Sequence, residues 1–328
     1  MTWRMWHNSR GWVGILTGVL LWLSSGALLA GAAQPGEDNI EQEAEEARRA
    51  LELFLREQRV LFRPGELSVE LSTFYSTDTT ARFAGVDLPR PFARVTTRAG
   101  FASFTARVGL LRDLEFDATI PVGVAEQEFD FGVARRRRDE QGLGDLTGSV
   151  RYELWHERGA RPDVILDVTA KSGLTAVSSL LGTGFWQVGG GISLVKTLDP
   201  VVFFGRLGYA AVLERNGIAP ADQVSYLLGA GFSLNDRVSL SMRVSGTEAG
   251  RIQLKGREIP GSNLDAISLQ WAVTTRATRH LYIEPFVNFG LTDDATDAIV
   301  GVTFVGVGFN WPFHRPGRAP QAYREGSH

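Results

Sequence analysis

From residue 66 onward, apolar and polar residues alternate along one segment of the chain after another. In G-L-G-D-L-T-G-S-V-R-Y-E-L, residues 142–154, small and apolar residues at even positions from Leu146 alternate with polar residues at odd positions. Successive side chains of a β-strand point to opposite faces, so each such strand has one apolar and one polar face. The pattern predicts about twelve strands of about 9–14 residues, the length that a tilted strand needs to cross a bilayer.

The connections between these segments also alternate, in length. Short turns are predicted near 109–113, 156–161, 197–200, 234–237 and 276–280, and longer polar links near 76–91, 123–142, 173–184, 214–222 and 247–263. Short turns at one end and long loops at the other are typical of outer-membrane barrels. The predicted fold is all-β: a closed antiparallel transmembrane β-barrel of about twelve strands over residues 66–311, preceded by a short N-terminal helix. The short turns are predicted to lie in the periplasm.

Residues 1–33 have the pattern of a secretory signal peptide. Arg4 and Arg10 precede an uncharged apolar run over 12–29, and Ala30-Gly31-Ala32 fits a cleavage site of small residues. The alternative is a single transmembrane anchor, since the run is roughly long enough to span a bilayer. Cleavage is favoured because acidic residues follow at once, and we expect export to the outer membrane of a Gram-negative cell.

Residues 34–65 are predicted to be a periplasmic helical segment. Apolar residues recur at spacings of three and four from Ile40 to Leu55, and Glu37 and Asp38 in the first turn suit the helix dipole. A solvated helix or short coiled coil is favoured over a plug that enters the barrel. The helix is too polar around most of its circumference to sit in lipid. The tail over 312–328, rich in Pro, Gly, Arg and His, is predicted to be a disordered periplasmic tail.

Composition narrows the possible functions. The formal net charge is −3, so bulk charge predicts no nucleic-acid partner. The chain has no cysteine, which excludes disulfides and cysteine-ligated metals. Mean hydropathy is −0.05, too low for a helical membrane protein but compatible with a barrel, in which half of each strand faces the lumen.

The polar faces of the predicted strands carry ions of both signs. A charge inside a barrel needs a partner or water, so these side chains either brace the interior as ion pairs or line a pore that selects solutes. The predicted inward-facing, pore-lining residues are Glu70, Arg107, Glu115, Asp117, Arg151, Glu153, Asp167, Lys171, Arg206, Arg243 and Glu284. We predict no catalytic residue, no cofactor and no metal site.

The sequence resembles the Gram-negative outer-membrane barrels known as putative meta-pathway phenol-degradation transporters. The matching stretches are R-E-Q-R-V-L-F-R-P-G-E-L-S-V-E at 56–70, V-G-L-L-R-D-L-E-F at 108–116, G-L-G-D-L-T-G-S-V-R-Y-E-L at 142–154, K-S-G at 171–173 and L-G-Y at 207–209. At 171–174, Lys-Ser-Gly-Leu stands where family members usually have Pro-Thr-Gly. The resemblance implies a channel or transporter for passive passage of small, hydrophobic or aromatic solutes.

The sequence alone leaves two other classes of function open. One is a non-conducting structural or surface-binding barrel, because twelve strands enclose a space that side chains can nearly fill. The other, less favoured, is a lipid-modifying outer-membrane esterase, which needs a serine and a histidine at the outer rim. His156 and His280 fall instead at predicted periplasmic turns, and no G-x-S-x-G stands on a strand-to-helix turn.

The expected partners follow from the predicted location. They are outer-membrane lipid, lipopolysaccharide, the small-molecule solute and the barrel-assembly machinery. That machinery is expected to recognise an aromatic residue at the end of the last strand, either Phe309 or Trp311. The basic run Arg135 to Arg138 is interpreted as part of a solvated outer loop, with binding of lipopolysaccharide phosphates or anionic solutes as the alternative.

Overall fold

The computed structural model describes residues 61–80, 82–83, 86–87, 94–131, 135–235 and 237–310. The predicted signal peptide, the predicted helix up to residue 60 and the predicted tail lie outside these residues. Residues 61–65 form a short turn that leads into the first strand. No helix in the described ranges is long and apolar enough to cross a membrane.

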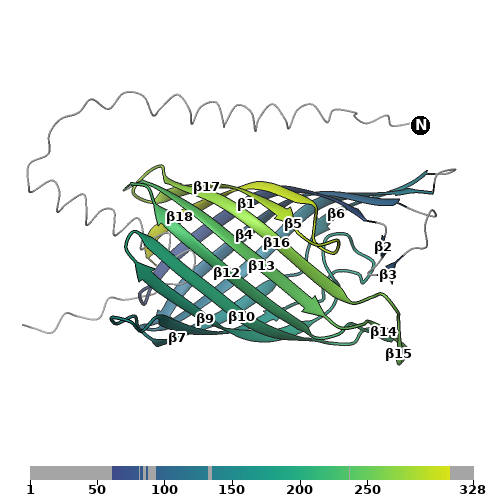
Figure 1. The fold of residues 1–328 in the computed structure, drawn as a ribbon, viewed down its shortest axis with the longest axis horizontal. Helices are drawn as coiled ribbons and strands as arrows, with labels where there is room; N and C mark the ends of the chain where they lie inside the picture. Colours follow the sequence, from purple (N-terminus) through teal and green to yellow (C-terminus); the bar gives the residue numbers. More distant parts are fainter. Residues whose placement is uncertain are drawn as a thin grey trace, which may run out of the picture. The chain divides into compact units, whose positions relative to one another are not determined.

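The described chain consists of β-strands and their connections (Figure 1). The long strands are β1 (Glu66–Thr80), β4 (Arg94–Leu111), β5 (Leu114–Asp130), β6 (Arg135–Leu143), β7 (Thr147–Trp155), β8 (Asp163–Lys171), β9 (Gln187–Leu198), β10 (Val201–Val212), β12 (Gln223–Ser233), β13 (Val238–Ala249), β16 (Leu264–Arg276), β17 (Leu281–Gly290) and β18 (Ala298–Asn310). Short strands in the connections are β2 (Arg82–Phe83), β3 (Val86–Asp87), β11 (Ile218–Ala219), β14 (Gln253–Leu254) and β15 (Arg257–Glu258).

The sheet closes on itself. Strand β1 pairs antiparallel with β4 on one side and with β18 on the other, so the first and last wall strands meet. Strands β6 and β7 both pair with β5 and together form one wall strand, which is broken at residues 144–146. The wall therefore has twelve strands, and the prediction of a closed twelve-stranded antiparallel barrel is confirmed.

The two faces of the wall differ as the alternation predicts. Large apolar side chains such as Phe104, Ile120 and Leu228 are exposed on the outside, and Leu228 leaves 70% of its surface uncovered. Side chains at intervening positions, such as Ser193 and Ser239, are buried on the inside. An apolar exterior around a polar interior is the arrangement expected when lipid surrounds a closed barrel.

The predicted long loop over 123–142 is wrong. Strand β5 continues to Asp130, and β6 begins at Arg135, so Arg135 to Arg138 lie in a strand and not in a solvated loop. Opposite charges face each other across the two strands: Arg137 Nη2 lies 2.9 Å from Glu126 Oε2, and Arg135 Nη2 lies 3.2 Å from Asp130 Oδ2. Cross-strand pairs of this kind favour the hairpin over a coil.

We predict that Leu228→Arg destabilises the barrel in lipid by about 2–4 kcal/mol, the cost of a charge on the lipid face near the bilayer midplane. The matched control is Leu254→Arg, because Leu254 is an exposed leucine of the connecting strand β14. Urea-dependent folding into lipid vesicles measures both changes. Equal effects of the two substitutions would contradict a lipid-facing position for Leu228.

Candidate functional site

The inner face of β1, β4, β5 and β7 carries a carboxylate–arginine cluster. Arg151 lies 3.2 Å from Glu115 Oε1 and 2.9 Å from Asp117 Oδ1, and Arg107 lies 3.3 Å from Glu70 Oε2. Glu115 is only 1% exposed. A buried carboxylate needs both a countercharge and hydrogen bonds, so these residues hold one another in place.

The turn before β1 completes this cluster. The backbone N–H of Phe62 donates to Glu115 Oε2 over 3.1 Å, and the Phe62 side chain is 2% exposed. Because Glu115 points to the inside of the wall, the chain passes along the inner face of the barrel at the short-turn end before it enters β1. The cluster therefore joins four strands to the segment that precedes them.

A second ion pair spans β8 and β10. Arg206 donates from Nε to Asp167 Oδ1 over 3.0 Å and from Nη2 to Asp167 Oδ2 over 2.6 Å. Two parallel bonds between a guanidinium and a carboxylate fix both side chains in orientation as well as in distance. Arg206 Nη1 also lies 3.4 Å from Ser225 Oγ on β12, so the pair reaches a third strand.

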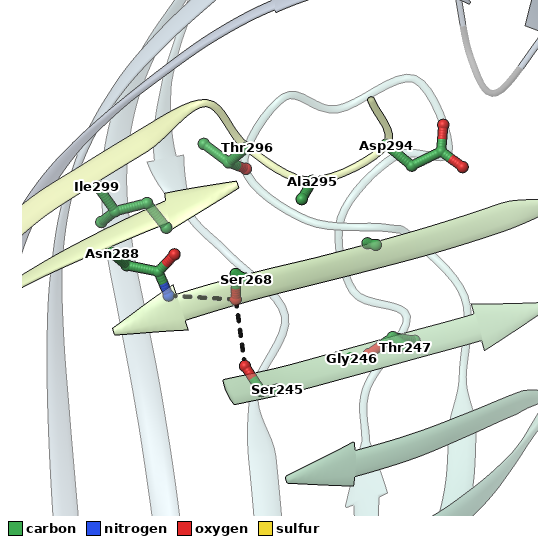
Figure 2. Close-up of a pocket in the computed structure, with 10 residues that line it drawn as sticks. Ser245, Gly246, Thr247, Ser268, Asn288, Asp294, Ala295, Thr296 and Ile299 are labelled. Carbon is green, nitrogen blue, oxygen red and sulfur yellow. Dashed lines mark hydrogen bonds between the residues drawn. The ribbon is translucent and has the colours of Figure 1, made fainter. Parts of the chain in front are cut away.

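On the opposite part of the inner wall, in β13, β16 and β17, the charged side chains Arg243 and Glu284 bond to neutral partners. Arg243 donates to Gln270 Oε1 over 2.7 Å, and Thr274 donates to Glu284 Oε2 over 2.5 Å. Near the long-loop end, Ser245, Ser268 and Asn288 form a hydrogen-bonded row beneath the link between β17 and β18 (Figure 2). This row lines a cavity of about 230 Å³ together with Asp294 and Thr296 of that link. The lumen thus has an ionic side and a hydroxyl-rich side.

The remaining predicted inward-facing residues lie apart from the cluster. Lys171 Nζ donates to Thr183 Oγ1 over 2.9 Å, and Glu153 lies beside His156 at the short-turn end. Glu115, Asp117 and Asp167 are buried and paired, which favours the bracing role for these three. That the predicted residues line an open pore stays a prediction.

The loop over 172–186 folds into the barrel, and Asp145 fixes it there. Asp145 lies at the break between β6 and β7, where its carboxylate accepts five hydrogen bonds. The donors are the N–H and hydroxyl of Thr175, the N–H and hydroxyl of Thr183, and the N–H of Gly184, at 2.8–3.2 Å. One carboxylate therefore holds both ends of the loop.

Two more side chains and an apolar contact fix the same loop. Glu140 accepts from Ser179 Oγ over 2.5 Å and from the N–H of Leu180 over 3.0 Å. Arg215, from the link after β10, donates to the carbonyl oxygens of Gly173, Thr175 and Gly184 at 2.6–3.0 Å. At the tip, Leu181 packs against Ala99 and Ala125. These alanines lie on the inner face of β4 and β5, so the loop narrows the lumen.

An aromatic row crosses the inner wall at the level of the folded loop. The strand register aligns Phe286, Gly301, Phe74, Phe101 and Gly123 on neighbouring strands. The rings of Phe74 and Phe101 stack at 5.3 Å. A Cβ on Gly301 would lie 2.6 Å from the Phe286 ring, and one on Gly123 would lie 2.6 Å from the Phe101 ring. The glycines therefore let the rings lie flat on the wall, and Leu181 extends this apolar band.

Sequence reasoning missed Glu140, Asp145 and the aromatic row. The signal for Asp145 is an acidic residue between Gly144 and Leu146 inside a strand pattern, which indicates an interruption of the strand. Phe74, Phe101 and Phe286 come from three distant segments, and only the register brings them into one row.

Comparisons with known proteins support the fold. A scan against models of known protein families finds no match. Among solved structures, an outer membrane channel from Pseudomonas putida F1 has a TM-score of 0.63 and 15% identity, over 75% of this chain and 97% of that one. At this identity the likeness establishes a common barrel fold. The resemblance to phenol-degradation transporters stays a prediction.

Two further solved structures match more weakly. The translocator domain of the autotransporter NalP from Neisseria meningitidis has a TM-score of 0.47 and 11% identity, over 85% of this chain and 100% of that one. The CymD monoaromatic hydrocarbon channel has a TM-score of 0.40 and 8% identity, over 86% of this chain and 96% of that one. At these scores neither match carries an argument about this chain.

We predict that Asp145→Ala releases the folded loop and raises single-channel conductance in planar bilayers. Each hydrogen bond to a carboxylate contributes about 1.5–3 kcal/mol, so loss of five leaves the loop held only by Glu140, Arg215 and the Leu181 contact among those described above. Asp293→Ala, in the link between β17 and β18, is the control for removing an acidic residue near the same end. Unchanged conductance in Asp145→Ala would show that the loop does not limit passage.

We also predict that Arg151→Met destabilises the barrel by about 3–5 kcal/mol, because Glu115 and Asp117 would both remain buried without the guanidinium that they share. The double variant Arg151→Met/Glu115→Gln removes one of these two buried charges, and part of the loss is expected to return. Urea unfolding in lipid vesicles measures both variants. A double variant as unstable as the single one would contradict the bracing role.

Proposed function

We propose that the protein is an outer-membrane channel for the passive passage of small solutes. The observation that carries this proposal is a closed barrel, apolar outside and ionised inside, whose lumen is narrowed by an inward-folded loop held at Asp145. A closed wall satisfies its backbone in hydrocarbon, and a polar interior admits water and solutes. The common fold with an outer membrane channel from Pseudomonas putida F1 supports this function.

Hydrophobic or aromatic molecules are the proposed solute class. The aromatic row and Leu181 give the lumen an apolar band at the level of the folded loop, between ionic and hydroxyl-rich surfaces. Rings that stack on exposed aromatic side chains gain about 0.5–1.5 kcal/mol beyond area burial, which suits weak and reversible binding along a path. The resemblance to phenol-degradation transporters points to the same class.

The orientation and partners follow from the proposed location. Short turns face the periplasm, and the long loops face outward. Glu126, Asp130, Arg135 and Arg137 then lie on the outer face beyond the apolar residues of β5, at the depth of lipopolysaccharide head groups. Phe309, half exposed near the end of β18, is placed for recognition by the barrel-assembly machinery during insertion.

A non-conducting structural or surface-binding barrel is the alternative. The observations that favour it are the buried ion cluster and the folded loop, since both fill the lumen. Conductance separates the two functions: a barrel that never conducts, in the wild type or in Asp145→Ala, would overturn the channel proposal and leave the structural one.

An esterase is a weaker candidate. In the described ranges, His156 contacts Glu153 and Asp113, and His280 contacts the carbonyl of Val307, so neither histidine is hydrogen-bonded to a serine. A nucleophilic serine needs an adjacent base. Both histidines also lie at the short-turn end, away from the outer leaflet that carries lipid A.

We predict that Phe101→Ala weakens the block of ion current by a small aromatic solute by roughly 2- to 12-fold, the equivalent of about 0.5–1.5 kcal/mol of ring contact. Phe289→Ala is the matched control, because Phe289 is exposed on the outer face. Planar-bilayer recording with increasing solute concentration measures the block. Equal block in the two variants would remove the aromatic row from the solute path while leaving the channel proposal intact.

A further inference from the structure

The short-turn end of the barrel brings together three side chains that can bind a metal ion. Asp113 lies in the turn between β4 and β5, Glu153 lies near the end of β7, and His156 follows β7 directly. One ligand atom from each of the three lies within 4.8 Å of the others. The sequence did not indicate this group, because Asp113 comes from a different hairpin.

The backbone holds the two hairpins in a fixed relation. The N–H of Glu153 donates to the carbonyl oxygen of Asp113 over 2.9 Å. His156 Nδ1 lies 2.5 Å from Glu153 Oε1, and His156 Nε2 lies 3.4 Å from Asp113 Oδ1. A single imidazole therefore stands between two carboxylates that come from different turns.

The chemistry of this group fits a borderline divalent cation. One imidazole nitrogen with two carboxylate oxygens is a ligand set that suits Zn²⁺ and similar transition-metal ions, whereas Mg²⁺ and Ca²⁺ prefer oxygen ligands alone. Three protein ligands leave coordination positions for water. The chain has no cysteine, so no thiolate competes for such an ion.

The surroundings leave room for the small movement that binding needs. The His156 side chain is 51% exposed, so there is space for the ring to turn one nitrogen toward both carboxylates when a cation replaces its present contacts. Asp163, at the start of β8, adds a third carboxylate beside Glu153 and strengthens the negative potential at this point. We propose that Asp113, Glu153 and His156 form a binding site for a divalent transition-metal cation, with Zn²⁺ as the probe, at the short-turn mouth of the barrel.

The first test is Zn²⁺ titration of the whole purified chain in detergent by calorimetry, with Mg²⁺ as the hard-cation control. Other histidines of the chain bind Zn²⁺ as background, so the comparison is between variants. His156→Ala and Asp113→Asn should each lower the Zn²⁺ affinity of one site by at least about tenfold. Even the loss of a residue that only hydrogen-bonds a metal ligand lowers metal affinity by that factor. His280→Ala, which removes an imidazole from another turn at the same end, should leave that site unchanged.

The second test uses the position of the site between two hairpins. A bound ion links the turn after β4 to the turn after β7, so Zn²⁺ should raise the unfolding temperature of the wild type and of His280→Ala but not that of His156→Ala. Identical Zn²⁺ binding and identical thermal shifts in the wild type, His156→Ala and Asp113→Asn would overturn the proposal. So would the absence of Zn²⁺ binding, or an equal response to Mg²⁺.

Discussion

The structure depends on one constraint, which is that every backbone N–H and C=O of a lipid-embedded wall must find a partner within the protein. An unpaired group in hydrocarbon costs several kcal/mol, so a sheet in a membrane has no tolerable edge. The antiparallel pairing of β1 with β18 meets this constraint by closing the ring. Closure in turn creates two separate surfaces, and the period-two alternation of the sequence assigns apolar side chains to one and polar side chains to the other.

The break at residues 144–146 shows how the same constraint shapes the interior. Residues 144–146 interrupt the pairing of β5 with the strand formed by β6 and β7. At this point backbone groups are satisfied locally: Gly144 donates to the carbonyl of Pro121, and Ser172 and Leu146 bond each other. The interruption also brings the Asp145 carboxylate to the base of the folded loop. A local departure from regular pairing thus supplies the carboxylate that holds the inward-folded loop.

The sequence predicts the barrel well because alternation is a local property of each strand. It predicts the inner face for the same reason, and the pairs of Arg151 with Glu115 and Arg206 with Asp167 join residues from that predicted set. It fails where the decisive contacts are distant. The β5–β6 hairpin looks like a polar loop until the charges on its two strands are seen to face each other. Asp145 and the aromatic row acquire their roles only through residues far away in the chain, which no local pattern reveals.

Arg215 connects the link after β10 to the loop that folds into the lumen. It belongs to the link after β10, yet all three of its carbonyl acceptors lie in the neighbouring loop inside the lumen. The Arg215 guanidinium and the N–H of Leu213, which donates to the carbonyl oxygen of Trp186 over 2.9 Å, therefore tie the two loops together. A displacement of the link after β10 would therefore also displace the loop over 172–186, whose Leu181 packs on the inner face of β4 and β5.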